Sequence, residues 1–100
     1  MSLESRKLLT IVTEAALEHE LSVEILRLGA HGYTVTDARG RGGRGVRNAS
    51  WTMSANIRIE VVCPAATAEA IAATLKERYY DNYAMILFLS EVEVLRPDKF

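Results

Sequence analysis

Residues 56–63 have the sequence NIRIEVVC, and their alternation of apolar and polar side chains decides the fold. An extended chain points successive side chains to opposite faces. The two faces here would carry Ile57, Ile59 and Val61 on one side and Arg58, Glu60 and Val62 on the other. This pattern predicts a strand with one buried face. Pro64 predicts the end of the strand, because proline has no N–H to donate to a neighbouring strand.

Beyond this strand the sequence predicts a helix and a last strand. Thr67 is a residue type that caps helices, and we expect the helix to begin there. Its apolar stripe would consist of Ala68, Ile71, Ala72, Leu75 and Tyr79. Residues 84–95 (AMILFLSEVEVL) are apolar and β-rich, which predicts the strand.

The first half of the chain has the same order of elements. Residues 8–13 (LLTIVT) and 33–36 (YTVT) favour strands. Between them one helix face would carry Leu17, Leu21, Ile25 and Leu28, and Gly29 predicts the helix end. A weak repeat of 50 residues aligns the halves, with Leu21 matching Ile71, Ile25 matching Leu75 and Tyr33 matching Tyr83.

Two strand–helix–strand halves predict an α+β, ferredoxin-like βαββαβ fold. Right-handed crossovers would place both helices on one face of a four-stranded antiparallel sheet. The other face would have no helices, yet residues 85–89 (MILFL) do not alternate and supply apolar side chains to both faces. An exposed apolar face of this kind is typical of a protein interface, so we expect an obligate oligomer.

Residues 36–47 (TDARGRGGRGVR) form the unusual segment of the chain. Five arginines and no acidic residue lie between residues 38 and 59, so a +5 segment belongs to a chain of net charge −1. Glycine lets backbone amides approach a ligand closely, and arginine forks match phosphate oxygens. The segment therefore favours a phosphate-bearing ligand or a small oxyanion. A solvated loop without a ligand and an RNA-binding loop are the alternatives.

The remaining composition favours a single non-catalytic domain. The chain has 100 residues, with no signal sequence and no apolar run long enough for a bilayer, so we expect a cytoplasmic protein without membrane insertion. Cys63 is the only cysteine, and we expect it to be a buried, inert thiol. His19 and His31 lack partners at ligand spacing, and no catalytic constellation is visible, so we expect neither a metal site nor an enzyme.

The segments KLLTIVTE (7–14), AHGYTVTDARG (30–40), GRGVR (43–47), NIRIEVV (56–62), DNYAMILF (81–88) and EVEVL (91–95) resemble the PII signalling family. The similarity covers nearly the whole chain and is closest to the carboxysome-associated and bicarbonate-transporter-associated PII-like branch. It implies one PII-like domain over residues 1–100, with a T-loop at about residues 40–56. It also implies a homotrimer whose sheets face inward and whose intersubunit clefts bind adenine nucleotides.

The resemblance implies a set of nucleotide-binding residues. Ile11, Thr34 and Val62 would line the adenine and ribose side, and Glu60 matches an acidic position facing this region. Gly40 and Gly42 would offer amides to the phosphates, and Arg41, Arg44 and Arg47 belong to the T-loop arginines that hold phosphate. Met85, Ile86 and Leu87 would contribute from the adjacent subunit.

The chain also departs from classical PII proteins. Its loop contains Trp51 and no tyrosine for modification, and residues 77–85 (ERYYDNYAM) lack the glycine and lysine of the classical B-loop. We therefore expect AMP or ADP as ligand, with ATP as a further candidate and bicarbonate as a second effector. The implied partner of the T-loop is a bicarbonate transporter or a carboxysome-related protein. A trimeric metal- or anion-binding protein and a weak nucleotide hydrolase are the alternative functions.

Overall fold

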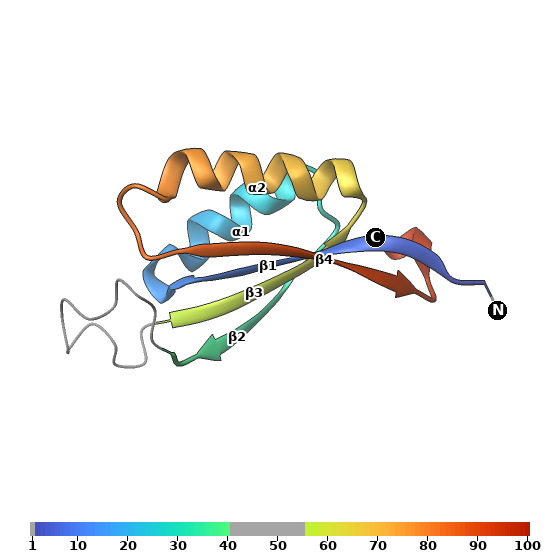
Figure 1. Cartoon of the computed structure of the whole chain (residues 1–100), viewed down its shortest axis with the longest axis horizontal. Helices are drawn as coiled ribbons and strands as arrows, with labels where there is room; N and C mark the ends of the chain where they lie inside the picture. The colour runs from blue at the N-terminus through green and yellow to red at the C-terminus, as the bar shows by residue number, and fades with distance from the viewer. Residues whose placement is uncertain (1, 41–55) are drawn as a thin grey trace.

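The computed structural model describes residues 2–40 and 56–100. The elements follow the order β1 (Glu4–Glu14), a 3-10 turn η1 (Ala15–Leu17), α1 (Glu18–Arg27), β2 (Thr34–Ala38), β3 (Asn56–Cys63), α2 (Ala65–Tyr79), β4 (Ile86–Val94) and a 3-10 turn η4 (Pro97–Lys99). Both helices lie on one face of the sheet, as Figure 1 shows. This is the predicted ferredoxin-like α+β fold.

The four strands form one antiparallel sheet in the order β2-β3-β1-β4. The central strand β1 pairs with β3 from Lys7 to Glu14 and with β4 from Glu4 to Val12. β1 begins four residues before the predicted strand, because its first residues pair with the last residues of β4 (Glu4 with Val94). The alternation of residues 56–63 is confirmed, since Ile57, Ile59 and Val61 are buried in β3.

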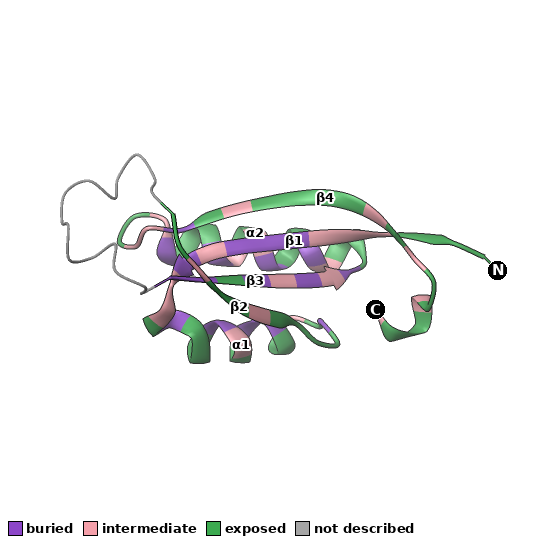
Figure 2. Cartoon of the chain, turned by 90° about the horizontal axis from the view of Figure 1, so that it is seen from below, coloured by how far each residue is buried: buried purple, intermediate pink, exposed green. Residues whose placement is uncertain are grey.

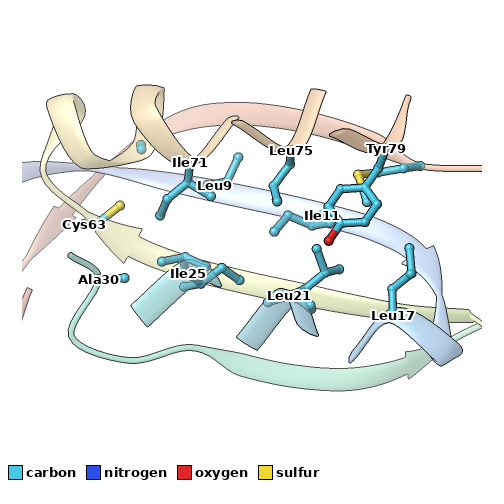
Figure 3. Packing of buried hydrophobic residues seen from close by; sticks show 14 of the residues in the cluster. Leu9, Ile11, Leu17, Leu21, Ile25, Ala30, Cys63, Ile71, Leu75 and Tyr79 are labelled. Carbon is cyan, nitrogen blue, oxygen red and sulfur yellow. The ribbon is translucent and has the colours of Figure 1, made fainter. Parts of the chain in front are cut away.

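The core fills the space between the sheet and the two helices (Figure 3). Both predicted helix stripes face it, and the repeat partners Leu21 and Ile71, like Ile25 and Leu75, are fully buried. Burying each such side chain contributes about 1.5–3 kcal/mol, so this layer ties the helices to the sheet. The opposite face, called the open face below, is not covered by either helix of the described residues (Figure 1).

The end of α1 confirms the prediction at Gly29. Its φ of 114° lies in the region that glycine tolerates and other residues rarely adopt. The Gly29 N–H donates to the Leu26 carbonyl at 3.1 Å, and the Ala30 N–H donates to the Ile25 carbonyl at 3.2 Å. These two bonds make a Schellman motif, which satisfies carbonyl groups at the helix end.

The prediction that Thr67 caps the second helix is wrong. α2 begins at Ala65, and Pro64 occupies the N-cap position with an extended backbone. The fixed φ of proline already suits this position, and the Pro64 carbonyl accepts a hydrogen bond from the Ala68 N–H at 3.0 Å. Thr67 lies within the first turn, so the proline both ends β3 and starts α2.

Candidate ligand site at the open sheet face

Strand register brings distant residues together on the open face. Directly paired residues of antiparallel strands share a face, so two rows cross the sheet from β2 to β4. The rows are Thr34, Glu60, Thr10 and Phe88, and next to it Thr36, Arg58, Val12 and Ile86. Thr34 and Glu60, both predicted site residues, are therefore direct neighbours. Val62 follows Glu60 on the same face and pairs with Leu8.

The β4 side of the open face is apolar and exposed. Ile86 is 57% and Phe88 is 46% exposed, although both are large hydrophobic residues. Figure 2 views this face and shows β4 mostly exposed beside the buried middle of β1. The prediction that β4 has apolar side chains on both faces is confirmed, because Leu87 packs against the core on the other side. Ile86 thus lies on the surface where a second subunit could reach it.

The β2–β3 side of the open face is polar. The Arg58 guanidinium lies 3.4 Å from a carboxylate oxygen of Glu60, and both side chains are partly exposed. Exposed ion pairs contribute little to stability, about 0–1 kcal/mol. The main contribution of this pair is therefore not stability. It places hydrogen-bonding groups beside Thr34.

Thr10 stands between the polar and apolar sides. It is fully buried, and its hydroxyl has no hydrogen-bond partner among residues 2–40 and 56–100. Buried polar groups nearly always have a partner, so an unpaired hydroxyl at this position is unusual. Sequence reasoning missed Thr10, because its place between Glu60 and Phe88 depends on the pairing of three strands.

The connection from β2 to β3, residues 39–55, contains the arginines and glycines and is called the arginine- and glycine-rich segment below. It leaves and rejoins the sheet at one end of the open face, and this place is called its root. Ala38 pairs with Asn56, which also pairs with Glu14, so the two ends of the segment meet beside the end of β1. Gly40 is exposed two residues beyond β2. The predicted phosphate-binding residues Arg41, Gly42, Arg44 and Arg47 lie outside the described part of the chain.

Three predicted site residues, Ile11, Met85 and Leu87, lie on the core side of the sheet rather than on the open face. Ile11 is fully buried beneath the helices, where Figure 3 shows it among the core side chains. Its side chain is therefore enclosed within its own subunit, and only its backbone could contribute to a ligand on the open face. Met85 is 8% exposed and also belongs to the core cluster. Residues 85–87 thus point in different directions, with Ile86 outward.

Sequence reasoning also missed two residues at the end of β1. The Thr13 hydroxyl donates to the Ala84 carbonyl, and the Glu14 carboxylate accepts from the Ala84 N–H. These contacts join residues about 70 positions apart, next to the root of the arginine-rich segment. No local pattern signals them, because they depend on where the α2–β4 connection returns to the sheet.

Three further features bear on function: the Cys63 thiol, possible metal ligands and possible membrane-spanning helices. Cys63 is buried, and burial raises the pKa of its thiol, so it is protonated and unreactive at neutral pH. Within the described ranges, no three His, Cys, Asp or Glu residues gather where they could hold a metal ion. None of the helices in those ranges has the length and apolar character needed to cross a bilayer.

A comparison with models of known protein families matches almost the whole chain. The model of the family described as P-II, nitrogen regulatory protein P-II, matches residues 6–99. This chain belongs to the P-II family. The resemblance found in the sequence is thereby confirmed.

Solved structures place the chain among the PII-like members of the P-II family. A crystal structure described as a PII-like signaling protein from Thermus thermophilus is 44% identical, covers 100% of this chain and 99% of that chain, and has a TM-score of 0.85. The protein CPII from Thiomonas intermedia, bound to ADP and bicarbonate, is 24% identical and has a TM-score of 0.85. The match covers 99% of this chain and 97% of that chain. CPII bound to ADP, AMP and acetate is 23% identical and has a TM-score of 0.86. The match covers 100% of this chain and 98% of that chain.

Proposed function

We propose that this P-II family member is a cytoplasmic, non-catalytic regulator that binds an adenine nucleotide in clefts between the subunits of a homotrimer. The ligand is AMP or ADP, with ATP as a further candidate. One observation carries the proposal: the arginine- and glycine-rich segment is rooted at Ala38 and Asn56, at the end of the open face, in a chain of this family. This composition suits phosphate recognition by backbone amides and guanidinium groups.

The open face supports assembly with further copies of the chain, and the number of three subunits rests on membership of the P-II family. Ile86 and Phe88 expose apolar area that an isolated chain would present to water. Covering this area with another copy removes it from water, which contributes roughly 25 cal/mol per Å² of apolar surface. The Thr10 hydroxyl, which has no hydrogen-bond partner among residues 2–40 and 56–100, belongs to the same face, and a trapped water molecule would satisfy it.

The ligand class is supported by related proteins and by the side chains present. CPII from Thiomonas intermedia binds ADP together with bicarbonate, and also ADP together with AMP. In this chain, Thr34, Glu60 and Val62 share the open face, and Ile86 is exposed on it. The nucleotide-binding set of the proposal comprises the described residues Ile11 (through its backbone), Thr34, Gly40, Glu60, Val62, Met85, Ile86 and Leu87, and the segment residues Arg41, Gly42, Arg44 and Arg47.

Regulation follows from differential affinity. A ligand that binds one arrangement of residues 40–56 more tightly than another shifts the population toward it. The conformation of this segment, and therefore the surface that it offers to a protein partner, then depends on which nucleotide is bound. Inorganic-carbon metabolism is the proposed setting, with bicarbonate as a second effector and a bicarbonate transporter or carboxysome-related protein as the partner.

The test is isothermal titration calorimetry with AMP, ADP and ATP on the wild-type chain and on a double variant, Arg44→Ala with Arg47→Ala. Hydrogen bonds to charged groups contribute about 1.5–3 kcal/mol each, so the double variant should lose at least tenfold in affinity. Arg78→Ala removes a guanidinium that lies on α2 and pairs with Glu24, and it should bind like the wild type.

Separate measurements test the phosphate assignment, the second effector and the absence of catalysis. Equal nucleotide affinity in the wild type and the arginine double variant would refute the phosphate assignment. A titration of bicarbonate against the ADP-bound protein, with chloride as the control anion, tests the second effector. Release of phosphate or AMP from ATP during prolonged incubation, lost in the arginine double variant, would instead establish a hydrolase.

A further inference from the structure

The connection between α2 and β4 is held by two consecutive residues of β1. The Thr13 hydroxyl donates to the Ala84 carbonyl at 3.1 Å, and the Ala84 N–H donates to a Glu14 carboxylate oxygen at 3.3 Å. Thr13 is 1% exposed, so its hydroxyl has little access to competing water. Both backbone polar groups of Ala84 are therefore fixed by side chains from the far end of the sequence.

The rest of this connection is also fixed by specific bonds. The N–H groups of Asn82 and Tyr83 donate to the Tyr79 carbonyl at 3.2 and 2.9 Å, which continues the end of α2. The Leu87 N–H donates to the Tyr80 hydroxyl at 3.2 Å. Ala84 thus lies between two anchored ends, and its position sets where residues 85–87 enter β4.

Glu14 has a second role through its backbone. It is the last residue of β1 and pairs with Asn56, which in turn pairs with Ala38. Asn56 is 9% exposed and is the first described residue after the arginine-rich segment. A single residue therefore contacts the root of that segment with its backbone and the α2–β4 connection with its carboxylate.

We propose that Glu14, together with Thr13, is a positioning residue that fixes residues 85–87 relative to the root of the arginine-rich segment. This rests on the proposed function, in which the arginine-rich segment contributes to one intersubunit cleft and residues 85–87 of the same chain contribute to the cleft of the adjacent subunit. Nucleotide affinity then depends on the Glu14 side chain through the geometry of Ala84, since a misplaced binding group loses its contribution even when it is present.

The first experiment measures amide hydrogen exchange by NMR in the nucleotide-free protein. Glu14→Ala should speed exchange of the Ala84 amide at least tenfold and also speed exchange at Asn56, because the end of β1 loses its side-chain anchor. Glu14→Gln keeps an oxygen acceptor and should stay within twofold of the wild type at both amides. Glu69→Ala removes an exposed glutamate on α2 and serves as the matched control.

The second experiment measures ADP affinity by calorimetry on the same variants, with circular dichroism and light scattering to confirm fold and assembly. Glu14→Ala should bind at least fivefold more weakly, Thr13→Val should also bind more weakly, and Glu14→Gln and Glu69→Ala should match the wild type. If Glu14→Ala does not fold, Thr13→Val decides the question, because it keeps the size and shape of the buried side chain.

The outcomes separate this inference from the proposed function. A wild-type chain that binds no adenine nucleotide refutes the proposed function, whereas the exchange experiment still decides the link between Ala84 and Asn56. Unchanged exchange at Asn56 in Glu14→Ala overturns that link. Equal ADP affinity in Glu14→Ala and the wild type overturns the positioning role. An equal loss of ADP affinity in Glu14→Gln and Glu14→Ala also overturns the positioning role. The effect would then come from the carboxylate charge rather than from the oxygen acceptor that holds Ala84.

Discussion

At the scale of single residues, the least expected group is the buried carboxylate of Glu24. Its side chain is 9% exposed, and it accepts hydrogen bonds from Arg27 on its own helix and lies 3.4 Å from Arg78 on α2. The helical pattern places Glu24 outside the apolar stripe, so the sequence alone does not predict its burial. The position of Arg78 beside it depends on how α2 packs next to α1, which no local pattern contains.

Glu24 makes the stability of the protein sensitive to acid. The hydrogen bond from Arg27 holds the pKa of Glu24 below its ordinary value of 4.5, aided by the charges of Arg27 and Arg78 and opposed by burial. A lowered folded-state pKa contributes stability above pH 4.5 that is lost as the pH falls through the folded-state pKa. We expect Glu24→Gln to unfold at lower urea concentration than the wild type at pH 7, and the difference to shrink below pH 4.5.

Urea titrations at several pH values check this expectation. Glu69→Gln, a change at an exposed position on the other helix, is the matched control and should show no such trend. A difference between Glu24→Gln and the wild type that stays constant into acid would contradict the ion-pair account.

Tyr79 gives the opposite sensitivity at high pH. Burial, followed by the hydrogen bond that its hydroxyl donates to Glu20 at 2.7 Å, raises its pKa from 10.0 to about 12. A raised folded-state pKa contributes stability that is complete below pH 10 and is lost as the pH rises through about 12. Ultraviolet titration should show a late-ionising tyrosine in the wild type that is missing in Tyr79→Phe. The same late step in that variant would contradict the assignment.

At the scale of elements, the existence and type of every predicted helix and strand followed from periodicity or from β-rich composition, while some boundaries did not. Gly29 predicted the end of α1 because only a residue without a side chain suits a positive φ. The start of α2 was wrong, since a threonine near a helix start is a common signal and the sequence does not reveal that Pro64 already fills the cap. The extra residues of β1 need β4 as a partner, and long-range pairing of this kind is invisible locally.

Gly29 and Gly32 offer a matched test of backbone conformation. A methyl group at Gly29 would meet only Thr67 at an ordinary distance of 3.9 Å, so the positive φ of 114° is the obstacle rather than space. We expect Gly29→Ala to lose about 1–3 kcal/mol of unfolding free energy. At Gly32 nothing lies within 4 Å and no positive φ is present, so Gly32→Ala should change stability little. Chemical denaturation compares the two, and equal effects would contradict the conformational explanation.

At the scale of the whole molecule, the sequence predicted one covered and one open sheet face, and it located the apolar strip of β4. It could not place individual candidate residues, because a strand register is needed to decide that Thr34 neighbours Glu60 while Ile11 faces the core. The resemblance to the P-II family supplied the candidate set, and the register sorts the described members by face.

The apolar part of the open face should control assembly. Phe88→Asp puts a charge where another subunit would pack, and we expect a smaller species in light scattering with an unchanged circular dichroism spectrum. Val23→Asp is the matched control, because Val23 is 52% exposed on α1, on the helix side of the sheet. An identical molar mass for Phe88→Asp and the wild type would contradict an assembly built on this face.

The molecule is elongated, with extents of 48 × 24 × 21 Å, and its two chain ends lie away from the end of β2 and the start of β3 (Figure 1). The last residues are held there by hydrogen bonds between Arg6 and the Pro97 carbonyl and between His31 and the Lys99 carbonyl. A fluorescent reporter or a sensor-chip linker attached at either chain end would therefore stand clear of the place where β2 ends and β3 begins.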